Sequence, residues 1–243
     1  MRIECVFRTE KIPVSYQYMF ASIVKGAIST FSKEKFDEIY HYDDKKTKQS
    51  KSFTFSVFMK KFELAGEHFE LKDDLKFILS TPDSELMLYI YNGLLSQKEY
   101  QYKGYQLSLV RVNLLKEQLP EKSEAIFKTL SPIAIKDKDG KFLAPDADEY
   151  GLTLNYVSNQ TLQNVRGYGL KEPLIFTPID MKRQVVKLKH EEFATLNDQH
   201  ILYVNAYRGM FKLEGAPEDL AFLTQTGIGF RRSSGFGNVQ FLR

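Results

Sequence analysis

The sequence predicts an α+β protein made of two tandem domains that share one element order, and three observations support this prediction. The chain has 243 residues, which is enough for two small domains with cores of their own. A hydrophobic content of 43% and a charged content of 27% are typical of a globular protein. Strand and helix patterns then follow the order β-α-β-β-α-β in each half, which is the ferredoxin-like (RRM-like) signature.

The first half, residues 1–120, contains the clearer set of patterns. Alternating apolar residues predict a strand over 2–8, and apolar residues at helical spacing predict a helix over 16–31 with Ser15 as its N-cap. A polar, lysine-rich segment follows at 33–52 and contains a short helical turn. The remaining predicted elements are a strand over 52–62, a hairpin over 66–80, a helix over 83–95 and a strand over 104–115.

The second half, residues 121–243, repeats this order more loosely. Its helix from Pro217 to Leu223 begins with proline near the first helical position, and two acidic residues favour the positive end of the helix. No repeat is visible at the level of single residues, so the duplication lies in the element order. The other predicted elements are strands over 125–135, 181–188, 201–213 and 238–242, and a helix over 146–165.

Composition limits the classes of function that the chain can have. The formal net charge is only +3, so any nucleic-acid site must come from local clusters of basic residues. The single cysteine, Cys5, excludes internal disulfides and cysteine-based metal clusters and indicates a reducing compartment. No run of about 18 apolar residues and no signal-peptide pattern is present. We therefore expect a cytoplasmic protein with no membrane contact, no metal and no cofactor.

A glycine-rich stretch near the end of the sequence is its most distinctive local pattern. Two Gly-apolar-Gly brackets are separated by five residues, of which two are arginines and two are serines. Exposed N–H groups, guanidinium groups and hydroxyls in such a loop suit phosphate binding. The spacing fits neither the dinucleotide fingerprint nor the P-loop, and the alternative is a hairpin that only turns the chain. The predicted phosphate-binding residues are Gly227, Gly229, Arg231, Arg232, Ser233, Ser234, Gly235 and Gly237.

Two further segments complete a family resemblance. Residues 129–134 (TLSPIA) open the second domain, while 16–18 (YQY) and 50–56 (SKSFTFS) lie in the first. Together with the glycine pattern at 227–237, they resemble the CRISPR-associated repeat-RNA endoribonucleases, the sixth-numbered Cas proteins of the RAMP superfamily. The resemblance spans nearly the whole chain. Its glycine loop, which other superfamily members share, implies RNA binding, and its N-terminal segments are more specific for the nuclease.

The resemblance implies a particular reaction. Family members cut CRISPR repeat RNA without metal, by attack of a ribose 2′-hydroxyl on the adjacent phosphate. The products carry a 2′,3′-cyclic phosphate and a 5′-hydroxyl, and mature guide RNAs result. The reaction needs a base, an acid and positive charge beside the phosphorane. Histidine, with a pKa of about 6.5, suits the proton transfers, and lysine or arginine suits the charge.

The resemblance also implies three catalytic residues. His41 matches the family position for a general acid or base, although an isolated loop histidine is otherwise more often simply exposed. Lys51 matches the catalytic lysine, with Lys45, Lys46 and Lys48 as substitutes if the loop is shifted. Some members carry a tyrosine on the first helix, and the nearest position here is Lys25. This departure leaves the third catalytic residue open.

The resemblance implies CRISPR repeat RNA (pre-crRNA) as the partner, and leaves other Cas proteins and a homodimer open. Lys187 and Lys189 share a face of a predicted strand and are candidates for RNA contact, with a solvated sheet edge as the alternative. A second function remains: a non-catalytic RAMP-type RNA-binding subunit of an effector complex. A third is a ferredoxin-like protein that binds no RNA.

Overall fold

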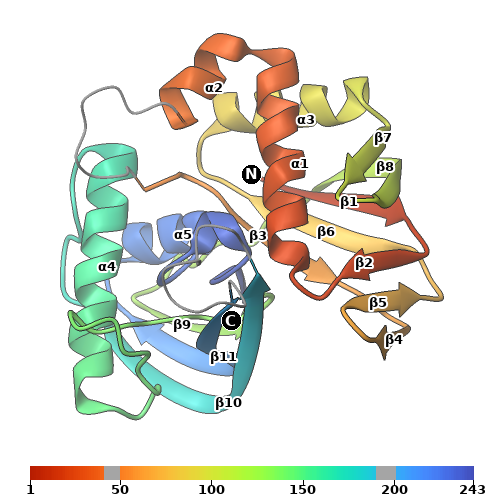
Figure 1. Cartoon of the computed structure of the whole chain (residues 1–243). Coiled ribbons are helices and arrows are strands. Elements are labelled where there is room, and N and C mark those ends of the chain that lie inside the picture. Colours follow the sequence, from red (N-terminus) through yellow and green to blue (C-terminus); the bar gives the residue numbers. More distant parts are fainter. Residues whose placement is uncertain (41–49, 190–200) are drawn as a thin grey trace.

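The computed structural model describes residues 1–40, 50–189 and 201–243. Its strands form two larger antiparallel sheets and one small three-stranded sheet. Figure 1 shows the first half of the chain, coloured red to yellow-green, beside the second half, coloured green to blue. None of the helices in the described part of the chain has the length and apolar character that crossing a membrane requires.

The first half of the chain forms a five-stranded sheet. Its strands are β1 (Arg2–Arg8), β3 (Thr54–Phe58), β6 (Leu75–Ser80), β7 (Glu99–Tyr102) and β8 (Tyr105–Leu115). They lie in the order β3-β6-β1-β8-β7, and all neighbours run antiparallel. The first four strands in this order make a ferredoxin-like sheet, so the predicted fold is confirmed, and β7 extends one edge.

Helices pack against this sheet and close its core (Figure 1). They are α1 (Tyr16–Phe31) and α3 (Ser84–Ser96), while α2 (Lys33–Tyr40) has no buried residue and contacts α1. Apolar residues of α1 recur at helical spacing, so one stripe of the helix is buried in the core. The rings of Phe20 on α1 and Phe77 on β6 stack with their centroids 5.1 Å apart. The short helical turn predicted after α1 is the separate helix α2.

The second half repeats the same architecture with four strands. They are β9 (Glu124–Thr129), β10 (Ile175–Lys189), β11 (Ile201–Glu214) and β12 (Val239–Phe241), in the order β10-β11-β9-β12. Helices α4 (Asp148–Arg166) and α5 (Pro217–Thr226) pack with them around a separate apolar core. This order again matches a ferredoxin-like sheet and confirms the predicted second domain fold. The boundary near residue 120 falls between the two sheets and stays a prediction.

The predicted hairpin over residues 66–80 is wrong. Its first strand, β5 (His68–Leu71), pairs with β4 (Phe62–Ala65) and β2 (Lys11–Pro13) in the small sheet. Its second strand, β6, joins the first large sheet because alternate residues, including Phe77, are buried in the core. The β4 residues are mostly exposed. Strand β6 is mostly buried, whereas β5 is only partly buried. The local sequence does not show this difference, which places β5 and β6 in different sheets.

Two strand boundaries also differ from the predictions. The predicted strand over 125–135 ends at Thr129, and beyond it only one isolated bridge, between Ile133 and Tyr207, continues the pairing. The predicted strand over 181–188 begins earlier, at Ile175. A register shift between Pro178 and Asp180 breaks the alternation there, and the edge position of β10 tolerates the proline.

Ser15 occupies the predicted N-cap position of α1 but makes no side-chain capping bond. Its hydroxyl donates to the backbone oxygen of Lys187 (3.0 Å) and accepts from the amide of Lys189 (3.0 Å). Both partners lie on β10 of the second domain. The serine therefore joins the two domains, a role that competes with helix capping and that no local pattern reveals.

Candidate functional site

The glycine-rich segment lies between the two domains and packs on the TLSPIA segment. The amide of Ile228 donates to the oxygen of Gly237 (2.9 Å), which draws the two glycine brackets together. The amide of Phe230 donates to Ala134 (2.9 Å), and that of Gly237 donates to Pro132 (2.9 Å). Two of the three segments that carried the family resemblance are therefore in direct contact.

The third segment meets them at the same place. The Thr54 hydroxyl on β3 donates to the backbone oxygen of Phe236 (2.9 Å). The buried Asn238 side chain donates to the Ser56 hydroxyl (3.3 Å) and to the oxygen of Ile78 (3.3 Å). We call residues 227–238 the interdomain clasp, because they bond to strands of the first domain while belonging to the second.

The glycines of the clasp are required by close packing. All four are buried and have positive φ values between 69° and 83°. A Cβ at Gly237 would lie 1.9 Å from the Ile228 oxygen, and one at Gly235 would lie 2.7 Å from the Phe55 ring. The amides of Gly227, Gly235 and Gly237 already donate within the protein. Those three N–H groups are therefore engaged within the protein, and phosphate binding by this loop stays a prediction.

The two arginines of the clasp have different environments. Arg231 is partly exposed and takes a left-handed conformation (φ 58°), after which the chain makes one short 3-10 turn. Arg232 is only 5% exposed. Its guanidinium donates to the Thr226 oxygen (2.8 Å) at the end of α5 and to the Ser50 hydroxyl in the first domain. Direct phosphate contact by Arg232 is thus disfavoured by its burial, whereas Arg231, Ser233 and Ser234 remain accessible.

Lys25 and Lys51 are far apart in sequence but meet at one aromatic side chain. The Lys51 ammonium lies 4.0 Å from the centroid of the Tyr40 ring, and the Lys25 ammonium lies 5.3 Å from it. Lys25 is also 5.4 Å from the Phe36 ring, which stacks on Tyr40. Such contacts hold cations by the negative face of the ring. We call Lys25, Lys51, Tyr40 and Phe36 the lysine–aromatic cluster.

His41 lies outside the described residues, as do Lys45, Lys46 and Lys48. It follows Tyr40 directly in the sequence. Tyr40 was not among the predicted site residues. Its four-residue spacing from Phe36 on a helix could have indicated that the two rings share a face.

A cavity of about 170 Å³ lies beside Lys51, where the two domains meet. The first domain contributes α2, the start of α3 and residues 50–52, and the second contributes Asn164 and Val165 at the end of α4. The ammonium of Lys35 in its wall is paired with Glu38 (3.0 Å) and Glu85 (3.4 Å). The candidate catalytic lysine therefore borders a polar recess built from both domains.

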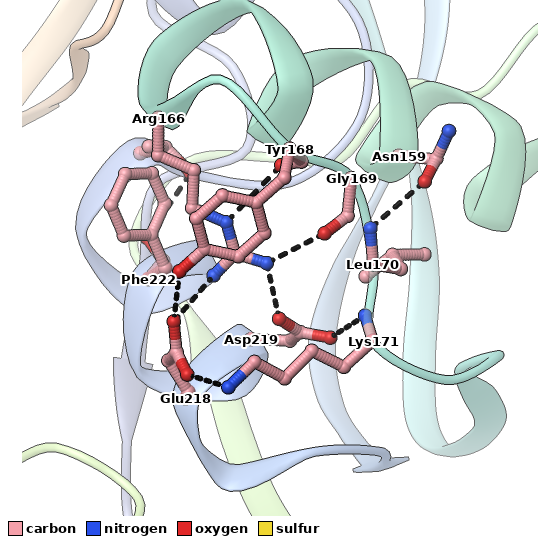
Figure 2. Close-up of polar contacts among 10 residues, drawn as sticks. Asn159, Arg166, Tyr168, Gly169, Leu170, Lys171, Glu218, Asp219 and Phe222 are labelled. Atoms are coloured by element: carbon pink, nitrogen blue, oxygen red, sulfur yellow. Dashed lines mark hydrogen bonds and ion pairs between the residues drawn. The ribbon is translucent and has the colours of Figure 1, made fainter.

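A charged network fixes the end of α4 that borders this cavity (Figure 2). The guanidinium of Arg166 donates to Asp219 (2.5 Å) and to the Gly169 oxygen (2.7 Å), and it lies over the ring of Tyr168 (4.1 Å). The fully buried carboxylate of Asp219 also accepts from the Lys171 amide (2.7 Å). Asp219 was predicted only to favour the start of its helix, and the structure adds this ion pair between α4 and α5.

A second recess, a groove of about 320 Å³, lies between the domains near the clasp. Tyr16, Phe58 and Phe62 give it an aromatic wall from the first domain, and Arg208 and Lys187 contribute cations from the second. Lys187 pairs with Glu67 (3.0 Å), and Lys189 is exposed on the same edge strand. Lys187 therefore lines this groove at an edge strand, which is compatible with both interpretations of these lysines.

Comparisons with known proteins first place the chain among proteins of this fold. A structure described as a Cas6-related gene product from Pyrococcus furiosus has 21% identity, a TM-score of 0.82, and covers 100% of this chain and 98% of its own. One described as a RAMP protein binding different RNA substrates has 19% identity, a TM-score of 0.80 and full coverage of both chains. A CRISPR-associated protein Cas6 has 23% identity, a TM-score of 0.75, and coverage of 100% and 99%.

The family follows from the sequence itself. The model of the C-terminal part of the CRISPR-associated protein Cas6 matches residues 115–241, more than half of the chain. The chain therefore belongs to the Cas6 family, as the resemblance predicted. No curated protein sequence matches it. The matched range contains the clasp and the TLSPIA segment, whereas Lys25 and Lys51 lie outside it.

Proposed function

We propose that the protein is a metal-independent endoribonuclease that cleaves CRISPR precursor RNA within its repeats. The observation that carries this proposal is the convergence of Lys25 and Lys51 on Tyr40, immediately before His41 in the chain. Membership of the Cas6 family supports a role in CRISPR RNA processing. The reaction is attack of a 2′-hydroxyl on the neighbouring phosphate, giving a 2′,3′-cyclic phosphate and a 5′-hydroxyl.

Each member of the site has a role that its chemistry suits. His41 transfers a proton as general acid or base, because imidazole titrates near neutral pH. Lys51 stabilises the charge that develops on the phosphorane, and Lys25 adds a second cation beside the same ring. Two ammonium groups repel each other when the site is empty and are both compensated when a phosphate lies between them. The cluster therefore favours the charged transition state.

RNA binding uses the groove between the domains. Unpaired bases stack on aromatic side chains such as Tyr16, Phe58 and Phe62, while cations contact the phosphates. Arg231, Ser233, Ser234, Lys187 and Lys189 are the candidates for those phosphate contacts. The four glycines support binding indirectly, by holding the clasp in shape, whereas Arg232 is too buried for direct phosphate contact. A similar structure is described as a RAMP protein that binds different RNA substrates, which supports this assignment.

The proposal is tested by incubating the purified protein with repeat RNA in EDTA and identifying the product ends. We expect cleavage with a 2′,3′-cyclic phosphate and a 5′-hydroxyl. A 2′-deoxy substitution at the cut site should block cleavage and leave binding intact. RNA that survives in EDTA and is cut only after Mg²⁺ is added would show that the metal-free mechanism is wrong.

The alternative is a non-catalytic RAMP-type subunit that holds guide RNA in a complex with other Cas proteins. The groove and the clasp favour it as much as they favour the nuclease, because neither needs a reacting group. It predicts binding of repeat RNA without cleavage at any metal concentration. Size-exclusion chromatography of the purified protein tests whether it forms a homodimer. We propose a cytoplasmic location for both the nuclease and the non-catalytic subunit.

A further inference from the structure

Arg232 has an environment that is unusual for a charged side chain. It is 5% exposed, and among the described residues no carboxylate pairs with it. Burial of a guanidinium is costly, and desolvation lowers the pKa of Arg232 to about 10, which still leaves it charged near neutral pH. Without an acidic partner, the desolvation cost of this buried cation must be offset by other groups. Its burial also suggests that the side chain has a specific role.

The end of α5 supplies the compensation. One Arg232 nitrogen donates to the oxygen of Thr226, the last residue of that helix, at 2.8 Å. The carboxyl end of a helix carries partial negative charge and free carbonyl groups, so it stabilises a cation. The left-handed conformation of Arg231 turns the chain just before Arg232. The second domain thereby holds the guanidinium in a fixed position.

The other Arg232 nitrogen donates across the domain interface to the hydroxyl of Ser50. Ser50 immediately precedes Lys51. On the other side of Lys51, the backbone oxygen of Ser52 accepts a bond from the Thr81 hydroxyl (2.7 Å). The residues that flank Lys51 are therefore both tied down, one by the second domain and one by the first. Lys51 reaches the Tyr40 ring from this fixed segment.

We propose that Arg232 is a positioning residue that sets the place of Lys51 through Ser50 and so couples domain docking to RNA cleavage. This inference rests on the proposed function of Lys51. It assigns the two arginines of the clasp to different tasks, with the partly exposed Arg231 as a candidate for RNA contact and Arg232 acting on the cleavage site from inside. The cleavage site is then complete only when the second domain is docked on the first.

The test compares Arg232→Met, Arg232→Lys and Ser50→Ala with Arg8→Met, which changes an exposed arginine that pairs with Asp74 on the surface. Single-turnover cleavage of repeat RNA at saturating protein is measured beside binding of the 2′-deoxy RNA. We expect Arg232→Met and Ser50→Ala to cleave about 10- to 100-fold more slowly, because small misplacements at a reacting centre have effects of this size. Binding should stay within about 2-fold of wild type. Arg232→Lys should cleave at an intermediate rate, and Arg8→Met like wild type.

Two outcomes would overturn the proposal. If Ser50→Ala cleaves at the wild-type rate, the bond from Arg232 to Ser50 does not position Lys51. Because this variant keeps Arg232, it tests the proposal even if Arg232→Met fails to fold. If Arg232→Met loses RNA binding instead of cleavage rate, Arg232 serves binding and does not position Lys51.

A second readout does not depend on cleavage. Mass spectrometry follows the rate at which an amine-reactive reagent labels Lys51. This rate should rise at least 2-fold in Ser50→Ala and Arg232→Met, while the labelling rate of the exposed Lys72 should stay unchanged. Unchanged labelling of Lys51 would refute the positioning role. A wild-type protein that never cleaves would instead refute the proposed function.

Discussion

The interdomain clasp and the lysine–aromatic cluster differ in how they are held. The clasp, residues 227–238, is mostly buried and is bonded to both domains through backbone and side-chain groups. The cluster is built of side chains around one ring, with Lys25 exposed and Lys51 partly exposed. The most distinctive sequence pattern therefore builds the interdomain clasp. Of the two cations that suit the chemistry, Lys25 lies on α1 and Lys51 lies in a segment with little pattern.

The largest expected effect concerns the ion pair between Arg166 on α4 and Asp219 on α5. Asp219→Ala removes the fully buried carboxylate partner of Arg166, whose remaining carboxylate contact is with the more exposed Glu218 (3.5 Å). Breaking such a buried pair by removing one partner costs about 3–5 kcal/mol. Denaturant unfolding measures this loss. Glu124→Ala, which removes an exposed partner of Lys212, should change the free energy of unfolding by less than about 1 kcal/mol. Equal losses in the two variants would contradict the structural role of the Arg166 network.

The next effect concerns the cluster. Lys51→Ala should lower the single-turnover cleavage rate by about 10²–10³-fold, as removal of one group that stabilises developing charge does. The free energy of unfolding and the affinity for 2′-deoxy repeat RNA should remain near wild type. Lys60→Ala, at an exposed position nearby in sequence, is the control. A Lys51→Ala protein that cleaves like the control would remove Lys51 from the mechanism.

A third effect tests whether the clasp needs glycine. Gly237→Ala combines a left-handed backbone with a Cβ only 1.9 Å from the Ile228 oxygen, so we expect a loss of about 2–4 kcal/mol. Gly140→Ala is a matched control, because Gly140 has a similar φ of +85° and no atom near the added Cβ. It should lose about 1–2 kcal/mol. Thermal and denaturant unfolding compare the two, and identical losses would mean that packing at Gly237 is unimportant.

The smallest effect comes from a single bond across the interface. Thr54→Val removes the hydroxyl that donates to Phe236 and leaves a buried carbonyl without that partner, which costs about 1–3 kcal/mol. Thr54→Ser keeps the hydroxyl and should retain most of the stability. If unfolding of Thr54→Val matches wild type, the bond contributes nothing to holding the clasp.

Much of the fold was predictable, because burial imposes a period on the sequence. The stripe that includes Phe20 and Val24 gave α1 its observed bounds, Tyr16–Phe31. The pairing partners of the strands were harder to predict from the sequence, since β5 and β6 are adjacent in sequence yet join different sheets. Ser15 illustrates the same limit: its hydroxyl finds acceptors and donors on β10, and a partner so distant in sequence leaves no local signal.

The site was predictable only as a set of residues. The family resemblance selected Lys25 and Lys51, but their shared contact with Tyr40 depends on how α1, α2 and the segment before β3 pack. Arg231 and Arg232 look equivalent in sequence. One backbone angle at Arg231 and the burial of the next guanidinium give them different environments. The sequence gives the charge of a side chain, whereas tertiary packing determines whether that charge is exposed to solvent.

The most direct test of the central claim is cleavage of repeat RNA in EDTA by a Lys25→Ala/Lys51→Ala protein. Its matched control is a Lys60→Ala/Lys61→Ala protein, which removes the same charge from the exposed surface. We predict that the cluster variant loses cleavage, while it still binds 2′-deoxy repeat RNA and unfolds like wild type, and that the control cleaves normally. Cleavage by the cluster variant at the rate of the control would contradict the assignment of the chemistry to the lysine–aromatic cluster.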